Sequence, residues 1–93
     1  MRARFVMGID LGGGGGRCLI VDTEAGTVAM SSRAWNHTRV PAYWPWAFDL
    51  DTARVWSAVG EMSREALAQA RIAADEIAAI GIVSMRHGMV VID

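Results

Sequence analysis

The sequence predicts an α/β fold: a meander of three short strands, then a long helix, then further strands. Residues 5–9 and 17–21 are short apolar runs, and residues 27–35 are β-branched at their start and partly alternating, which is typical of strands. After Asp51, apolar residues recur at spacings of three and four, as on one face of a helix. Residues 80–84 form another apolar run.

The connections between the first three strands are short. Five glycines join the first pair, and "DTEAG" joins the second, with Asp22 opening the turn and Gly26 closing it. A parallel crossover needs a dozen or more residues, so these strands are expected to be antiparallel. No internal repeat or domain boundary interrupts the chain.

Asp51 is a good N-cap, and the helix is expected to run from there to about residue 69–71. Its apolar stripe is expected to be a core face and comprises Val55, Trp56, Val59, Met62, Ala66, Leu67 and Ala70. A short helical turn is expected at residues 75–78, a buried strand at 80–84 and a fifth strand at 89–93.

Residues 36–48 are expected to form an irregular loop, because Pro41 and Pro45 break regular elements. The loop also carries Tyr43, Trp44 and Trp46, more aromatic surface than a plain linker needs. These side chains either cover a sheet edge or a helix face, or form a wall of a ligand cleft.

Composition excludes several classes of protein. The 93 residues are 53% hydrophobic with a net charge of -1 and no basic run, so neither nucleic acid nor an anionic membrane is an expected partner. All nine basic residues are Arg. The single cysteine, Cys18, lies in an apolar run and is expected to be buried in a reducing compartment. Without a secretory or membrane-spanning segment, the expected location is the cytoplasm.

The glycine run has three familiar interpretations, none of which fits. A linker would have polar flanks, whereas both flanks here resemble strands. A dinucleotide-binding turn needs G-x-G-x-x-G followed by a helix, but starting from Gly12 the third glycine position falls on Arg17. A P-loop needs Gly-Lys-Ser/Thr, and the chain has no lysine.

A glycine hairpin after a strand ending in Asp10 fits the residues better. Glycine leaves no side chain between backbone N–H groups and a ligand, and consecutive amides can bind an anion. Asp10 beside a bare phosphate would repel it, but Mg²⁺ between them would accept both, since this ion takes one or two carboxylates plus phosphate oxygens and water. Arg17 can either donate to phosphate or fix Asp10.

These residues resemble the first phosphate-binding hairpin of the FGGY carbohydrate kinases, in the sugar kinase, heat-shock ATPase and actin superfamily. In "GIDLGGGGGRCLIVD", Asp10, Gly12 and Arg17 match the family's Asp-x-Gly-Thr-Thr/Ser-x-x-Arg in order and spacing. "AFDLDTARVWSAV" resembles the family's acid-x-Asp segment and helix, and "IAAIGIVSMRHGMVVID" resembles its next strand and loop. "SRAWNH", "VPAY" and "SMRHG" most resemble autoinducer-2 kinase-like members; "HG" is similar to xylulokinases, and the Arg before it to glycerol kinases.

The resemblance implies a ribonuclease H-like (actin-like ATPase) N-terminal subdomain and ATP-dependent phosphorylation of a sugar or polyol hydroxyl. It implies Mg²⁺ at Asp10, and ATP phosphates at Arg17 and at the amides of Gly12, Gly13, Gly14, Gly15 and Gly16. Arg86 and His87 match positions that contact substrate hydroxyls, and Trp46 is a further candidate beside the substrate.

Two departures from the family pattern matter. Glycine replaces the family's Thr/Ser hydroxyls from Gly13 onward, and His87 stands where an acid is frequent in glycerol kinases and autoinducer-2 kinase-like members. The chain also ends before the family's catalytic Asp and its C-terminal adenosine-binding domain. Residues 1–93 are therefore expected to be an incomplete N-terminal part, inactive alone and prone to self-association, of a parent that is itself a homo-oligomer. The alternative is a non-catalytic nucleotide-binding or interaction module derived from such a kinase.

Overall fold

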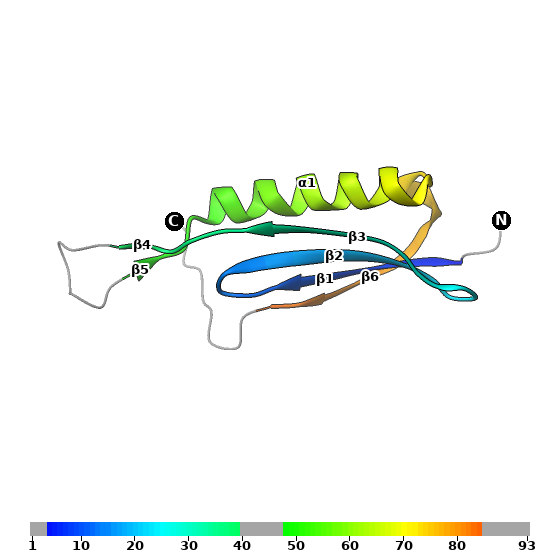
Figure 1. The fold of residues 1–93 in the computed structure, drawn as a ribbon, viewed down its shortest axis with the longest axis horizontal. Helices are drawn as coiled ribbons and strands as arrows, with labels where there is room; N and C mark the ends of the chain where they lie inside the picture. The colour runs from blue at the N-terminus through cyan, green and yellow to red at the C-terminus, as the bar shows by residue number, and fades with distance from the viewer. Residues whose placement is uncertain (1–3, 40–47, 85–93) are drawn as a thin grey trace.

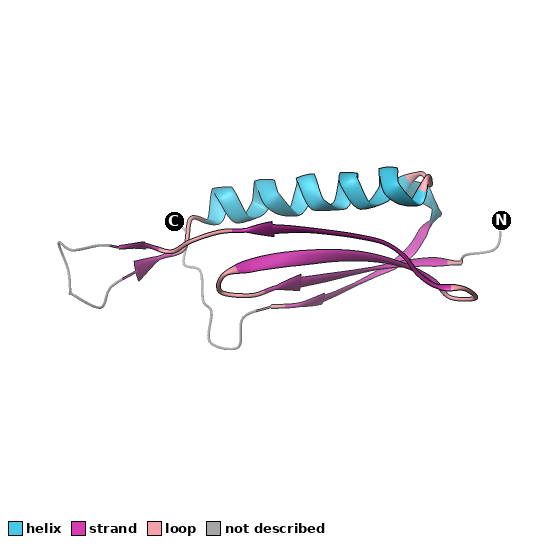
Figure 2. Cartoon of the chain, viewed as in Figure 1, coloured by secondary structure: helices cyan, strands magenta, loops and turns pink. Residues whose placement is uncertain are grey.

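The computed structural model describes residues 4–39 and 48–84, which form one sheet with a long helix on one face and a separate pair of very short strands (Figure 1). The elements in chain order are β1 (Phe5–Leu11), β2 (Gly15–Asp22), β3 (Gly26–Ala34), β4 (Thr38–Arg39), β5 (Phe48–Asp49), α1 (Thr52–Ala70), the 3₁₀ turn η1 (Ala74–Glu76) and β6 (Ile77–Val83). Figure 2 shows the helix lying along the sheet as a second layer. The expected α/β class is confirmed.

The sheet has the strand order β3-β2-β1-β6. β1 pairs with β2, and β2 with β3, in antiparallel register, so the predicted meander is confirmed. β6 pairs with β1 in parallel. A parallel strand needs a long crossover connection, and the chain between β3 and β6 supplies one that contains α1. This topology brings Val83 of β6 beside Asp10 of β1.

The core lies between one face of the sheet and α1. Alternate residues of β1, β2 and β3 face this core, and the buried hydrophobic residues are Met7, Ile9, Cys18, Ile20, Ala29, Trp35, Ala58, Met62 and Ala66. Cys18 is buried as expected, and burial raises the pKa of its thiol, which makes it a small apolar side chain in practice. The hydroxyl of Ser31 donates to the Met62 carbonyl oxygen at 2.7 Å and joins β3 to α1 inside this core.

The helix begins where the sequence predicts. The Asp51 carboxylate accepts a hydrogen bond from the Arg54 amide at 3.0 Å, and the helix ends before Arg71, which has the left-handed φ of 58°. The prediction that Trp56 packs in the core is wrong, because its side chain is 78% exposed. The buried face of α1 includes Ala58. Trp56 lies two positions before Ala58, which is a rotation of about 200° around the helix axis, so its side chain lies on the opposite face. Among the described residues, no helix has the length and apolar character needed to cross a membrane.

β6 differs from its prediction in both bounds and burial. The strand starts at Ile77, after a helical turn that spans Ala74–Glu76 rather than residues 75–78. Its side chains were expected to be buried, but Ile80, Ile82 and Val83 are 57%, 64% and 67% exposed. The reason is that β6 is an edge strand, while α1 packs over β2 and β3. An exposed apolar edge strand of this kind favours pairing with another chain. Self-association of the chain stays a prediction.

The segment after β3 is partly regular rather than wholly irregular. β4 and β5 pair in antiparallel register, Thr38 with Asp49 and Arg39 with Phe48, and so close the two described ends of this segment. Tyr43, Trp44 and the predicted strand at residues 89–93 lie outside the described residues.

Candidate functional site

The glycine run is part strand and part turn. β1 continues to Leu11 and β2 starts at Gly15, so only Gly12, Gly13 and Gly14 connect the strands, and the Gly12 amide donates to the Gly15 carbonyl at 2.8 Å. The predicted hairpin is confirmed, although it is shorter than the run of glycines. A strand directly after the turn also excludes a dinucleotide-binding turn, which needs a helix there.

Two of the five glycines are needed for close packing. A Cβ atom on Gly15 would lie 2.6 Å from the Arg33 carbonyl oxygen, and one on Gly16 would lie 2.7 Å from Cη2 of Trp35. A Cβ atom on Gly14 would meet nothing within 4 Å. Of the described glycines only Gly26 has a positive φ. No residue of the glycine run therefore has the left-handed backbone conformation that would favour glycine there.

The carbonyl oxygens of the turn all bond to the segment that follows β3. Gly12 O accepts from the indole Nε1 of Trp35 at 3.2 Å, and Gly14 O accepts from the Trp35 amide at 3.2 Å. Nε2 of His37 lies 2.8 Å from Gly13 O. No hydrogen bond in the described part of the chain is donated by the amides of Gly13 or Gly14. Among the described residues, the hairpin therefore presents two backbone donors that have no partner.

Asp10 and Arg17 form an ion pair beside these amides. They face each other across β1 and β2, and Nη2 of Arg17 lies 3.0 Å from Oδ2 of Asp10. The two side chains are 45% and 60% exposed, so the pair is weak and its partners can exchange for a ligand. Of the two predicted roles of Arg17, the structure shows the contact with Asp10.

An open cavity of about 330 Å³ lies over this end of the sheet and is lined by Asp10, Gly12, Gly15, Gly16, Arg17 and Arg33. Side chains alternate along a strand, so Asp10 points to the opposite face from Ile9, which packs beneath α1. The described residues contain no cluster of three or more metal-ligating side chains, and Asp10 is the one carboxylate among the residues that line the cavity. A lone carboxylate suits a cation whose other ligands are phosphate and water.

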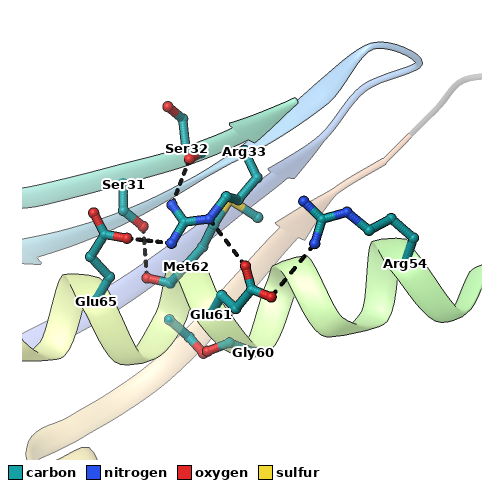
Figure 3. Close-up of polar contacts among 9 residues, drawn as sticks. Ser31, Ser32, Arg33, Arg54, Gly60, Glu61, Met62 and Glu65 are labelled. Atoms are coloured by element: carbon teal, nitrogen blue, oxygen red, sulfur yellow. Dashed lines mark hydrogen bonds and ion pairs between the residues drawn. The ribbon is translucent and has the colours of Figure 1, made fainter. Parts of the chain in front are cut away.

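Arg33 fastens β3, the strand that directly precedes Trp35, to the helix (Figure 3). Its Nε donates to Glu61 at 3.2 Å, and its Nη2 donates to Glu65. These bonds, with that to Glu65 the stronger, raise the pKa of Arg33. Arg54 lies 3.5 Å from the second oxygen of Glu61, which completes a network that sets β3 against α1.

Trp35 and His37 are the residues that sequence reasoning missed. His37 is exposed, as a loop histidine is expected to be, but its contact with the hairpin has no local signal in the sequence. Trp35 does have one, because it continues the every-second-residue pattern of Ala29 and Ser31, which face the core. The three predicted substrate residues Trp46, Arg86 and His87 lie outside the described residues, so the structure does not place them relative to the hairpin.

Comparison with known proteins gives a family for this arrangement. Residues 5–93 match the N-terminal domain of the FGGY family of carbohydrate kinases. A solved structure of a putative N-acetylglucosamine kinase from Chromobacterium violaceum superposes with a TM-score of 0.50 and 17% identity, covering 87% of this chain and 35% of that one. The likeness at this identity supports the fold.

Two curated relatives are similar over almost the whole chain. Autoinducer-2 kinase of Salmonella paratyphi B is 35% identical over 89 residues, which are 96% of this chain and 17% of that enzyme. Autoinducer-2 kinase of Escherichia coli O139:H28 is 36% identical over 86 residues, which are 92% of this chain and 16% of that enzyme. The chain thus spans about a sixth of the length of these relatives, and it belongs to the FGGY family of carbohydrate kinases.

Proposed function

We propose that the hairpin between β1 and β2 binds the phosphates of Mg·ATP, and that the protein to which this chain belongs transfers phosphate to a sugar or polyol hydroxyl. The observation that carries the proposal is that the amides of Gly13 and Gly14 have no partner in the described part of the chain and lie beside the exposed carboxylate of Asp10. Amides alone would suit a simple anion, but a carboxylate next to them suits an anion with a divalent cation.

The residues present fit Mg²⁺ in the way its chemistry requires. Asp10 supplies one carboxylate, and the cavity beside it leaves room for phosphate oxygens and water as the other ligands. When bound, Mg²⁺ neutralises charge on the phosphate oxygens. We propose that Asp10 holds the ion directly or through water.

The chain's own groups bind and orient the phosphates. The amides of Gly13 and Gly14 donate to phosphate oxygens, with Gly12 and Gly15 forming the walls of the same turn. The guanidinium of Arg17, which is 60% exposed, can leave Asp10 and donate to a second phosphate oxygen. Phosphoryl transfer depends mainly on such positioning and charge stabilisation, from both sides of the phosphate.

We propose that substrate hydroxyls contact Arg86 and His87, with Trp46 nearby. The curated relatives are named for autoinducer-2, and the structural neighbour for N-acetylglucosamine. Both names indicate a small polyoxygenated acceptor, so a sugar or polyol is the proposed class. The chain supplies one side of the phosphate site, and turnover is proposed to need a catalytic base and an adenosine pocket from the rest of a longer protein.

The test is ADP release by the longest reading frame that contains this sequence. The assay uses Mg·ATP with a panel of polyols, ketoses, N-acetylglucosamine and autoinducer-2. We expect substrate-dependent ADP release, and a loss of at least about a hundredfold in Asp10→Ala, in line with the loss of a group that stabilises transferring phosphate. Asp75→Ala is the matched control, because Asp75 is an exposed acid in η1, an element that does not line the cavity.

The alternative function is a nucleotide-binding or interaction module without catalysis. The observation that favours it is the absence of hydroxyl side chains at Gly13 and Gly14, which leaves the phosphates fewer donors. Binding of Mg·ATP that depends on Asp10, without ADP release in the presence of any acceptor in the panel, would favour this module. Equal activity in Asp10→Ala and the parent would contradict both functions at this site.

A further inference from the structure

We propose that Trp35 and His37 are positioning residues: they hold the carbonyl oxygens of the glycine hairpin so that the amides of Gly13 and Gly14 face the bound phosphates. The inference rests on the proposed function of the hairpin. It assigns a role to two side chains that belong to neither the metal site nor the cavity lining.

The planarity of the peptide group links each carbonyl oxygen of the hairpin to the next amide. In a trans peptide the C=O and the N–H of the next residue point in opposite directions. The indole of Trp35 binds Gly12 O at 3.2 Å, so the Gly13 amide points away from Trp35. His37 binds Gly13 O at 2.8 Å, so the Gly14 amide points away from His37. The two amides, which have no partner in the described residues, are thus oriented by side chains that bond the carbonyl oxygen at the opposite edge of the same peptide group.

The hairpin gains from an external restraint because the hydrogen bond from the Gly12 amide to the Gly15 carbonyl oxygen leaves the peptides of Gly13 and Gly14 unrestrained from within the turn. Glycine loses more conformational freedom on ordering than any other residue, and no side chain from Gly12 to Gly16 can form a local hydrogen bond. In the described structure, the restraining contacts come from Trp35, which lies 23 positions after Gly12, and from His37, which lies 24 positions after Gly13.

The two contacts are built differently, which allows them to be tested separately. Trp35 is only 6% exposed, and its ring packs where a Gly16 side chain would be, so it belongs to the core as well as to the hairpin. His37 is exposed, so its removal leaves the core intact. A carbonyl oxygen only accepts, so His37 contributes through a protonated Nε2 that donates to Gly13 O.

The experiment measures dissociation constants for Mg·ADP and for adenosine in the longest reading frame that contains the chain. The variants are Trp35→Phe, which keeps the ring but removes the donor, His37→Leu, which removes the donor, and His37→Gln, which keeps one. We expect Trp35→Phe and His37→Leu each to weaken Mg·ADP by about three- to tenfold, as the loss of one hydrogen bond predicts. Adenosine affinity should not change, and His37→Gln should restore most of the Mg·ADP affinity.

The control is Trp56→Phe, which changes an exposed tryptophan on α1 outside the hairpin and should change neither constant. Unchanged Mg·ADP affinity in both Trp35→Phe and His37→Leu, with loss in Asp10→Ala, would refute the positioning role and leave the proposed function standing. Parallel loss of Mg·ADP and adenosine would assign both residues a merely structural role. Mg·ADP affinity that does not depend on Asp10 would refute the proposed function, and the positioning role with it.

Discussion

The turn from β2 to β3 and the hairpin from β1 to β2 connect neighbours in one sheet, but their polar groups have different partners. In the turn from β2 to β3, Oδ1 of Asp22 accepts from the amides of Glu24 and Ala25 at 2.9 and 3.3 Å. Nε of Arg4 donates to both oxygens of Asp22, at 2.9 and 2.8 Å. The amides of Glu24 and Ala25 are thus satisfied by a side chain that the turn itself carries, as in an Asx turn.

The glycine hairpin does the reverse. It carries no side chain of its own, its carbonyl oxygens bond to Trp35 and His37, and two of its amides have no partner in the described residues. A turn with internal partners is complete without a ligand, whereas a hairpin held from outside keeps donors for one. The comparison teaches that missing local partners, and not the glycine count, distinguish the turn that we propose binds phosphate.

The largest expected effect separates the tight and open glycines of the hairpin. Gly15→Ala places a Cβ atom 2.6 Å from the Arg33 carbonyl oxygen, so the free energy of unfolding should fall by about 1–3 kcal/mol. Gly14→Ala, with nothing within 4 Å of the new atom, should change it by less than about 0.5 kcal/mol. Thermal unfolding of the two variants measures the difference, and equal losses would contradict the packing role of Gly15.

The next effect concerns the turn from β2 to β3 and depends on pH. The hydrogen bond from Arg4, helped by the amides of Glu24 and Ala25, lowers the pKa of Asp22 from 3.8 to about 2. A lowered pKa means that the ionised carboxylate stabilises the fold above about pH 4, and that this contribution is lost as the pH falls toward 2.

Asp22→Asn should therefore lower the unfolding midpoint at neutral pH, and the gap to the parent should narrow between pH 4 and 2. Asp75→Asn, at an exposed site, serves as the comparison. A gap for Asp22→Asn that stays constant down to pH 2 would show that the charge of Asp22 plays no part.

The smallest effect concerns the open end of the hairpin. Gly14→Ser has space for the side chain and no left-handed backbone to strain, so stability should change by less than about 0.5 kcal/mol. The hydroxyl adds a donor beside the phosphates, so Mg·ADP should bind up to about tenfold more tightly. Titration calorimetry decides this, and unchanged binding would place the phosphates away from Gly14.

Local patterns predicted much of the fold. Alternation and short turns predicted the meander, and the Asp51 cap and its spacing predicted α1, because these signals lie within a few residues of one another. The exposure of β6 and of Trp56 could not be predicted this way. Burial depends on which elements cover a residue, and α1 covers β2 and β3 instead of β6.

The site divides in the same manner. Asp10 and Arg17 are predictable because their strands are joined by a short turn, which brings them together across the ladder. The contacts of Trp35 and His37 with the hairpin depend on where β3 ends relative to β2, a tertiary property without a local motif. Long-range contacts of this kind require the structure.

The most direct test of the central claim is hydrogen exchange of the peptide that covers the glycine hairpin, in the longest reading frame that contains the chain. The free amides of Gly13 and Gly14 should exchange rapidly without ligand. The account predicts that Mg·ADP slows this exchange, that adenosine does not, and that Asp10→Ala abolishes the protection. Bound Mg·ADP that protects other segments but leaves the hairpin unchanged would contradict the assignment of the phosphate site.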